Sequence, residues 1–153
     1  MLAIAVVIAG FDQVTKSLIR GKIAIIGTIE VIRGFFEFSY SENTGAVFGT
    51  FQGRNGIFII VGLLAIVFIF IYYSRFKENT WMKISLGLIL GGAVGNLTDR
   101  LFFGSVTDFI RIRLTHSFWW PNFNIADSGV TVGAIILIIV LFKDSYKAEK
   151  SIN

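Results

Sequence analysis

Four long apolar runs divide the chain, at about residues 1–20, 57–73, 83–103 and 124–142. At a rise of about 1.5 Å per residue, each run is long enough to cross about 30 Å of hydrocarbon as a helix. We therefore predict an all-α, polytopic membrane protein that forms one domain, a bundle of four transmembrane helices. An even number of spans places both termini on the same side of the membrane.

The two long connections, at about 21–56 and 104–123, have the patterns of β-strands. β-branched runs or alternating apolar and polar residues occur in Ile23–Ile26, Thr28–Ile32, Phe36–Tyr40 and Ile110–Leu114. Because both connections follow an odd-numbered span, they lie on the same side of the membrane. The sequence therefore predicts a small β-sheet at the outer, extracytoplasmic surface.

Lysine and arginine residues indicate the orientation only weakly. The predicted inner segments are a loop at about 74–82 and a tail at 143–153. The short connection between the second and third runs carries Arg75, Lys77 and Lys83, and the C-terminal tail carries Lys143, Lys147 and Lys150. Those of the long connections are Arg20, Lys22, Arg33, Arg54, Arg100, Arg111 and Arg113. Only the higher density of basic residues in the short segments favours cytoplasmic termini.

The composition agrees with a membrane protein, because 54% of the residues are hydrophobic, 16% are charged and the mean hydropathy is +0.73. The net charge of +4 is spread between the apolar runs, which suits phospholipid headgroups and not nucleic acid. The chain has no cysteine, and His116 has no partners at metal-binding spacing. We therefore expect no thiol chemistry, no metal and no cofactor.

The first run does not have the pattern of a cleavable signal peptide. It lacks a basic start and a small-residue cleavage site, and Asp12 and Lys16 interrupt it. It also begins without a flanking segment, which leaves open a native start upstream of Met1.

Asp108 is the first candidate for chemistry. In a strand it shares the apolar face of Val106 and Ile110, whereas Arg111 and Arg113 point to the other face. Burial on that face should raise the pKa of the Asp108 carboxyl. A solvated loop aspartate is the alternative interpretation.

Asp127 opens the fourth run and is the second candidate. Helical spacing places Asn124, Asp127, Ser128 and Thr131 on one polar stripe, which should face the interior of the bundle. Asn124 as N-cap and Asp127 three residues later also form a capping box. Capping explains those two residues but not Ser128 and Thr131.

The other runs differ in their polar content. In the third, a small-residue surface for close helix packing is formed by Gly87, Gly91 and Gly95. Asn96 and a charge pair, Asp99–Arg100, follow, and such a pair is costly in a membrane unless it is functional or reaches the headgroups. The second run is free of charge and is predicted to be a lipid-facing scaffold.

Asp12 and Lys16 lie four residues apart on the first run and can pair. We favour a structural ion pair, since a Ser–Lys protease needs a neutral lysine and a neighbouring aspartate opposes that state.

Three classes of function remain open on these grounds. Two carboxylates that share a proton can activate water and hydrolyse a peptide without a cofactor. A small transporter or proton-relay subunit would instead need a polar path across the membrane, but the ionisable residues gather at one side. A lipid-binding assembly protein leaves the two aspartates without a role, and no G-x-G-D motif of presenilin-type proteases occurs.

Five motifs in order resemble those of the bacterial lipoprotein signal peptidase family, also called signal peptidase II. They are Asp12–Lys16, Asn43–Phe48, Gly91–Arg100, Val106–Phe109 and Phe123–Ser128. The resemblance covers nearly the whole chain. It implies an aspartyl protease fold of four transmembrane helices with an outer β-cradle.

The resemblance also implies the roles of particular residues. Asp108 and Asp127 correspond to the catalytic dyad. Positions that shape the site or hold substrate correspond to Asp12, Lys16, Asn43, Gly45, Asn96, Asp99, Arg100 and Asn124.

The family's substrates are prolipoproteins whose lipobox cysteine carries a diacylglyceryl group, and the cut falls just before that cysteine. The resemblance implies the bacterial cytoplasmic membrane, contact with phospholipid, and inhibition by globomycin-type peptides. We expect the aromatic segment Phe35–Phe51 to cover the bound substrate.

Overall fold

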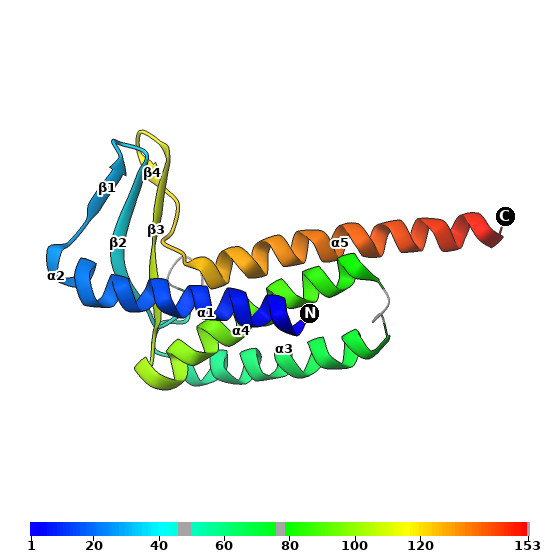
Figure 1. Cartoon of the computed structure of the whole chain (residues 1–153). Coiled ribbons are helices and arrows are strands. Elements are labelled where there is room, and N and C mark those ends of the chain that lie inside the picture. Colours follow the sequence, from blue (N-terminus) through cyan, green and yellow to red (C-terminus); the bar gives the residue numbers. More distant parts are fainter. Residues whose placement is uncertain (46–49, 76–78, 153) are drawn as a thin grey trace.

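In the computed structural model, which describes residues 1–45, 50–75 and 79–152, long helices lie side by side and a small sheet crosses one end of them (Figure 1). The long helices are α1 (Leu2–Leu18), α3 (Asn55–Arg75), α4 (Thr80–Phe103) and α5 (Ile125–Ile152). A π-helical turn, η1 (Ile19–Ile23), and the short α2 (Ala24–Ile26) extend α1. The strands are β1 (Ile29–Ile32), β2 (Phe36–Asn43), β3 (Val106–Thr115) and β4 (Phe118–Trp119).

Helix α4 is the centre of the bundle, because it packs against α1, α3 and α5. The predicted glycine surface faces α1: a Cβ atom on Gly87 or on Gly91 would lie 2.8 Å from a backbone carbonyl oxygen of that helix. Gly92 and Gly133 allow an equally close approach between α4 and α5. The prediction of close helix packing through small residues is confirmed.

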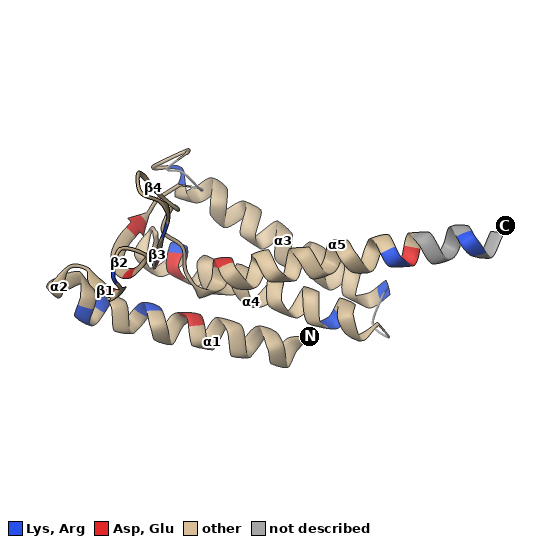
Figure 2. Ribbon diagram, turned by 90° about the horizontal axis from the view of Figure 1, so that it is seen from above, with Lys and Arg blue, Asp and Glu red and all other residues tan. Residues whose placement is uncertain are grey.

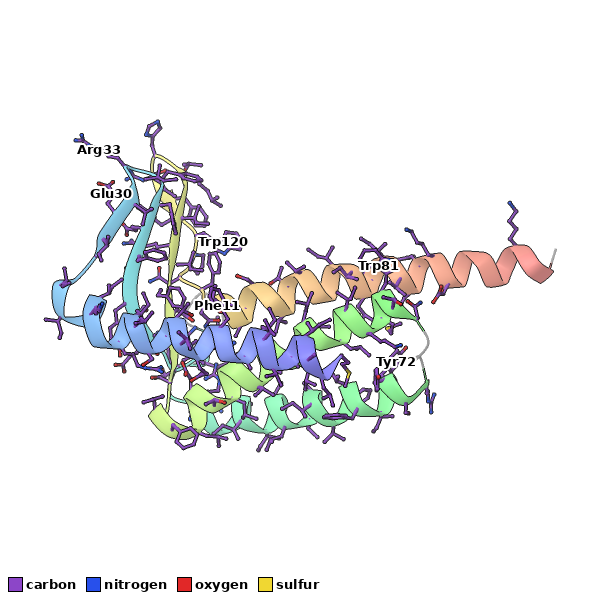
Figure 3. The ribbon with its side chains drawn as sticks, in the orientation of Figure 1. Phe11, Glu30, Arg33, Tyr72, Trp81 and Trp120 are labelled. Atoms are coloured by element: carbon purple, nitrogen blue, oxygen red, sulfur yellow. The ribbon has the colours of Figure 1, made fainter. Side chains whose placement is uncertain are left out.

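Three helical segments are long and apolar enough to cross a membrane, namely Leu2–Ile26, Asn55–Arg75 and Ile125–Ser145. Their outward side chains are apolar and exposed, as Phe11 on α1 illustrates at 58% exposure (Figure 3). Helix α4 does not meet the same criterion, because glycines and polar residues lower its hydropathy. Its crossing of the membrane stays a prediction. Only Ile69 of α3 is buried, in agreement with a lipid-facing scaffold.

The four strands form one antiparallel sheet in the order β1-β2-β3-β4. The two long connections therefore pair with each other, since β2 comes from the first and β3 from the second. Their register sets Ser41 opposite Asp108 and Asn43 opposite Val106, beyond an irregularity that follows Phe38. This confirms the predicted sheet and its two central strands.

The prediction of a strand at Ile23–Ile26 is wrong, because these residues are helical. Ile19 and Ile23 lie four residues apart and pack together against Phe109 of the sheet. Helical spacing thus buries both side chains, and the helix ends only at Gly27, whose φ is +96°. The segment predicted as an inner tail, 143–153, is a continuation of α5 as far as Ile152.

Candidate active site

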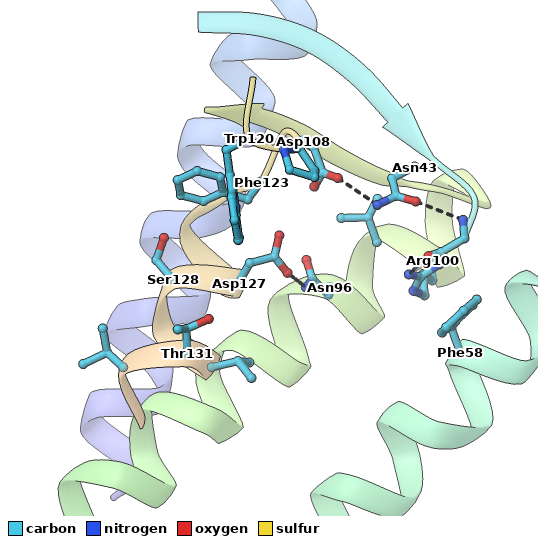
Figure 4. Close-up of a pocket in the computed structure, with 15 residues that line it drawn as sticks. Asn43, Phe58, Asn96, Arg100, Asp108, Trp120, Phe123, Asp127, Ser128 and Thr131 are labelled. Atoms are coloured by element: carbon cyan, nitrogen blue, oxygen red, sulfur yellow. Dashed lines mark hydrogen bonds between the residues drawn. The ribbon is translucent and has the colours of Figure 1, made fainter. Parts of the chain in front are cut away.

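Asp108 and Asp127 lie at the same cavity, where the sheet meets the helices (Figure 4). Asp108 comes from β3 and is 3% exposed, and Asp127 lies in the first turn of α5. The cavity has a volume of about 680 Å³ and is lined mostly by apolar side chains, among them Phe58, Val130 and Phe123. The two candidates, 19 residues apart in sequence, therefore converge.

Asn124 connects the two carboxyl groups. Its Nδ2 donates to Asp108 Oδ1 at 2.7 Å, and its Oδ1 accepts from the Asp127 backbone N–H at 2.9 Å. The Asn124 backbone N–H donates in turn to Asp127 Oδ2 at 3.2 Å. The predicted capping box is therefore present, and the same residue also reaches across to β3.

Asn43 holds the other oxygen of Asp108. The pairing of β2 with β3 places its Nδ2 2.9 Å from Asp108 Oδ2, and its Oδ1 accepts from the Gly45 N–H at 3.0 Å. Burial, followed by the nearby charge of Asp127, raises the pKa of the Asp108 carboxyl to about 7. The amide donors of Asn43 and Asn124 oppose that shift without cancelling it.

Behind Asp127 lies a buried polar network. Asn96 Nδ2 donates to Asp127 Oδ1 at 2.7 Å, and Asn96 Oδ1 accepts from Lys16 Nζ at 2.9 Å. Lys16 is fully buried and pairs with Asp12 at 2.8 Å, which confirms the predicted ion pair. A Cβ atom at position 95 would meet the carboxylate of Asp12, so Gly95 makes this approach of α1 to α4 possible.

Asp99 and Arg100 do not pair with each other, but each is partnered, as charged residues in a membrane helix are expected to be. Adjacent helical side chains point in different directions, and the two groups have separate partners. Asp99 pairs with Lys16 and with Arg20, at 3.4 and 3.2 Å, and accepts from the Thr107 N–H.

Arg100 instead turns toward the cavity and the start of α3. It donates to the Gly45 carbonyl oxygen at 2.9 Å and to Asn55 Oδ1 at 3.3 Å, and its guanidinium lies over the Phe58 ring. It thereby ties the chain after β2 to α3 beside the two aspartates.

The first part of the predicted covering segment, Phe35–Phe51, is strand β2, which pairs with β1 on one side and with β3 on the other. Residues 46–49 lie outside the part of the chain that the structure describes. Gly45 lines the cavity next to Asn43, so the described end of this segment does reach the site.

Several site residues were not predicted from the sequence. Arg20 bridges Asp99 and Thr107, and Gln13 donates to Asp99 and to the Gly95 carbonyl oxygen. Arg20 follows Lys16 by four residues, so extending the Asp12–Lys16 stripe by one turn would have found it. The partners Asn55, Phe58 and Trp120 carry no comparable local signal.

Charged residues gather at the sheet end and at the opposite end of the helices, with long uncharged stretches between them (Figure 2). Within the described ranges, no group of three or more His, Cys, Asp or Glu side chains is arranged to hold a metal ion. What the site offers is two carboxyl groups, amide donors and an apolar cavity. These functional groups are the ones that an acid–base catalyst in a membrane protein requires.

Comparison with known proteins agrees with this class. The family model for signal peptidase (SPase) II matches residues 4–143. The lipoprotein signal peptidase of Halothermothrix orenii is 38% identical over 140 residues, covering 92% of this chain and 93% of the relative. That of Pseudomonas aeruginosa PAO1 is 34% identical over 153 residues, covering 97% and 90%. The chain therefore belongs to the signal peptidase II family, which is a family of proteases.

Solved structures lead to the same fold. One bacterial membrane enzyme superposes with a TM-score of 0.83 at 36% identity, over 94% of this chain and 87% of the other. A second gives 0.79 at 37% identity, over 93% and 92%. The bundle with its small sheet is thus the fold of a membrane enzyme.

Proposed function

We propose that this protein is the endopeptidase that removes the signal peptide from diacylglyceryl-modified bacterial prolipoproteins, cutting just before the lipidated cysteine, with Asp108 and Asp127 as its catalytic dyad. The observation that carries the proposal is that one residue, Asn124, joins the two carboxyl groups in one cavity, since its side-chain amide donates to Asp108 and its backbone N–H donates to Asp127. The name of the relatives, lipoprotein signal peptidase, supports the substrate class.

The chemistry requires one ionised and one protonated carboxyl group. The ionised aspartate takes a proton from a water molecule that attacks the scissile carbonyl carbon, while the protonated aspartate polarises the carbonyl oxygen. The leaving amine then takes up a proton as the C–N bond breaks.

The charges around the cavity support one shared proton. Four carboxyl groups lie in or directly behind the site, and the described cations in contact with them or with the cavity are Lys16, Arg20 and Arg100. If all four carboxyl groups were ionised, four negative charges would face three positive ones, and one negative charge would stay uncompensated in an apolar cavity. A single proton on Asp108 or Asp127 restores neutrality.

Access from lipid follows from the depth of the site. Asp127 lies three residues after Asn124, the residue that caps α5, which is about 5 Å along the helix at a rise of about 1.5 Å per residue. Below it, the cavity continues along Val130, Thr131 and Val132 of α5, opposite Phe58 of α3. We infer that the acyl chains of the substrate lie along this apolar part, so that the scissile bond is held level with the dyad.

The proposed topology places four spans in the cytoplasmic membrane, the sheet outside and both termini in the cytoplasm. On the sheet side, Arg20 and Arg111 are neutralised by Asp99 and Glu37, and Arg100 lies in the site. The support for the opposite end as the inner one is the higher density of basic residues in its short segments. A reporter that works only in the cytoplasm should therefore be active when it is fused after residue 153, and one that works only outside the cytoplasm should be inactive there.

A transporter or proton relay is less well supported, because the described ionisable groups form a cluster at the sheet end and not a path along the bundle. The direct test incubates the purified protein with a diacylglyceryl-modified lipopeptide that spans the cleavage site. We expect one cut before the cysteine, blocked by globomycin and insensitive to EDTA. No cleavage of the lipopeptide, or a metal requirement, would contradict the proposal.

A further inference from the structure

A buried lysine that does not line the cavity is connected to one of the two aspartates through a single amide. Lys16 Nζ lies 2.8 Å from Asp12 Oδ2 and 3.4 Å from Asp99 Oδ2. It also donates to Asn96 Oδ1 at 2.9 Å. An ammonium group has three N–H donors and no acceptor, so these three oxygens use its full capacity. Lys16 is fully buried, and a substrate in the cavity does not touch it.

Lys16 determines which way the Asn96 amide faces. Because the ammonium can only donate, the atom of Asn96 next to it must be the carbonyl oxygen, and Asn124 Nδ2 donates to the same oxygen at 3.2 Å. The NH₂ group is then turned to Asp127 Oδ1, 2.7 Å away. If the amide turned over, its oxygen would face Asp127, and that contact requires a proton on the aspartate.

The two aspartates therefore differ in what orients their donors, a buried ammonium on one side and backbone N–H groups on the other. Asp127 accepts from the Asn96 amide, which Lys16 fixes, and from the backbone N–H of Asn124 at the start of α5, where the helix dipole favours negative charge. Asp108 accepts from two side-chain amides; among the described residues, backbone N–H groups orient them, that of Gly45 for Asn43 and that of Asp127 for Asn124. No ion pair with a described cation reaches Asp108 or Asp127 directly.

We propose that Lys16 is a positioning residue which, by fixing the amide of Asn96, keeps Asp127 as the ionised, proton-accepting member of the dyad and leaves the shared proton on Asp108. This inference rests on the proposed protease function. Water then bonds to the carbonyl carbon and gives a proton to Asp127, while Asp108 gives its proton to the carbonyl oxygen. On cleavage of the C–N bond, the amine takes the proton from Asp127, and a hydroxyl of the diol returns one to Asp108.

The charged groups that surround Lys16 decide how it can be tested. Asp12 on α1 and Asp99 on α4 face it, Arg20 pairs with Asp99, and Asp108 and Asp127 lie beyond the amides. Arg100 on α4 lines the same cavity. Removing Lys16 alone would leave a buried carboxylate uncompensated, which is strongly destabilising. The substitutions are therefore made together with Asp12→Asn, which keeps the network neutral.

The test compares Asp12→Asn/Lys16→Gln with Asp12→Asn/Lys16→Met. Both carry the same charge, but only glutamine keeps an N–H donor for Asn96 Oδ1. We expect the methionine variant to lose kcat by about tenfold or more relative to the glutamine variant, the scale of one buried hydrogen bond. KM should stay the same, because position 16 does not touch the substrate. The acid limb of kcat/KM against pH should move to higher pH in the methionine variant alone.

Ser85→Ala is the structural control, since Ser85 is fully buried on α4 and its hydroxyl donates to the Met82 carbonyl oxygen, away from this network. It should lower Tm without moving the acid limb. If the double variants do not fold, Asn96→Asp gives the second test: it keeps the contact with Lys16 but sets an oxygen against Asp127, so the acid limb should move to higher pH.

Equal kcat and equal acid limbs in the two double variants, or an unmoved acid limb in Asn96→Asp, would overturn the role of Lys16. Activity of Asp108→Asn or Asp127→Asn would instead overturn the dyad itself. The two failures are therefore distinguishable.

Discussion

At the scale of single residues, the site depends on amide side chains whose direction is fixed. Asn43, Asn96 and Asn124 each accept from a group that can only donate, and each turns an N–H toward the carboxyl group of Asp108 or Asp127. Such donors stabilise a negative charge in an apolar cavity without adding a charge of their own.

The first prediction concerns the dyad. Asp108→Asn and Asp127→Asn should each lower kcat by about 10²- to 10⁴-fold, the usual contribution of a general acid or base. Both proteins should still insert and keep a cooperative thermal transition. Glu42→Gln, the same chemical change at an exposed position of β2, is the control. Near-normal turnover in either aspartate variant would remove that residue from the dyad.

The second prediction concerns pH. The pKa of Asp108 is about 7 in the folded protein against 3.8 for a free side chain. Between these values the folded state holds a proton that the unfolded state has lost, so stability is full below about pH 4 and falls as the pH rises toward about 7. Tm measured in detergent should decrease over this range, and less steeply in Asp108→Asn. Asp144→Asn, at an exposed carboxylate, should keep the wild-type slope.

Much of this residue-scale picture could be predicted from the sequence. The period of two in β3 placed Asp108 on a buried face, and helical spacing placed Asn124 and Asp127 together. The partners of Asp99 and Arg100 could not be predicted, because they come from α1, α3 and the chain after β2. No local spacing specifies contacts between residues so far apart in sequence.

At the scale of elements, the start of α5 and the packing of α4 determine how the residues of the site are positioned. The helix begins at a capping box whose first residue also reaches β3, and glycines let α1 and α5 approach α4 closely. The strand wrongly predicted at Ile23–Ile26 shows the limit of pattern reading, because a short β-branched run is compatible with both structures. The helical structure is favoured here because it packs both Ile19 and Ile23 against Phe109.

The third prediction separates the two roles of Asn124. Asn124→Ser keeps a cap for the Asp127 N–H but cannot reach Asp108, whereas Asn124→Ala loses both. Loss of a cap costs about 1 kcal/mol, so the alanine variant should have the lower Tm. Both variants should lose most of their kcat. If the serine variant were as active as the wild type, the bridge to Asp108 would have no catalytic value.

The fourth prediction concerns helix packing. Gly91→Ala sets a Cβ atom 2.8 Å from the Ala5 carbonyl oxygen, and such overpacking costs about 1–3 kcal/mol. Its Tm should fall. Gly10→Ala is the matched control, because a Cβ there has no neighbour within 4 Å and alanine favours the helix. Equal Tm values for the two variants would contradict the close approach of α1 and α4.

At the scale of the whole molecule, a bundle with exposed apolar helices carries its charged site at one end, under the sheet. The sequence predicted this division into spans and a sheet, because hydropathy and alternation are local properties. It could not predict that α4, the long helix that is not among the three candidate membrane spans, is the one that the others surround. That arrangement depends on three separate helix contacts.

The fifth prediction follows from the position of the site in lipid. One peptide sequence, with and without the diacylglyceryl group, is compared in the same detergent. Burial of acyl chains contributes about 0.8 kcal/mol per methylene, so the lipidated form should have a kcat/KM larger by several orders of magnitude. Equal values for the two forms would contradict entry of the substrate from the membrane.

Asn124 both caps α5 and bonds to Asp108, and this has a consequence for the biogenesis of the protein. The residue that caps α5 also supplies the contact with Asp108 on β3, so the two aspartates are bridged only when the start of this helix lies against the sheet. In the proposed protease, a nascent chain whose last span has not yet left the insertion machinery therefore lacks an assembled dyad. Completion of the fold is then itself the activation step.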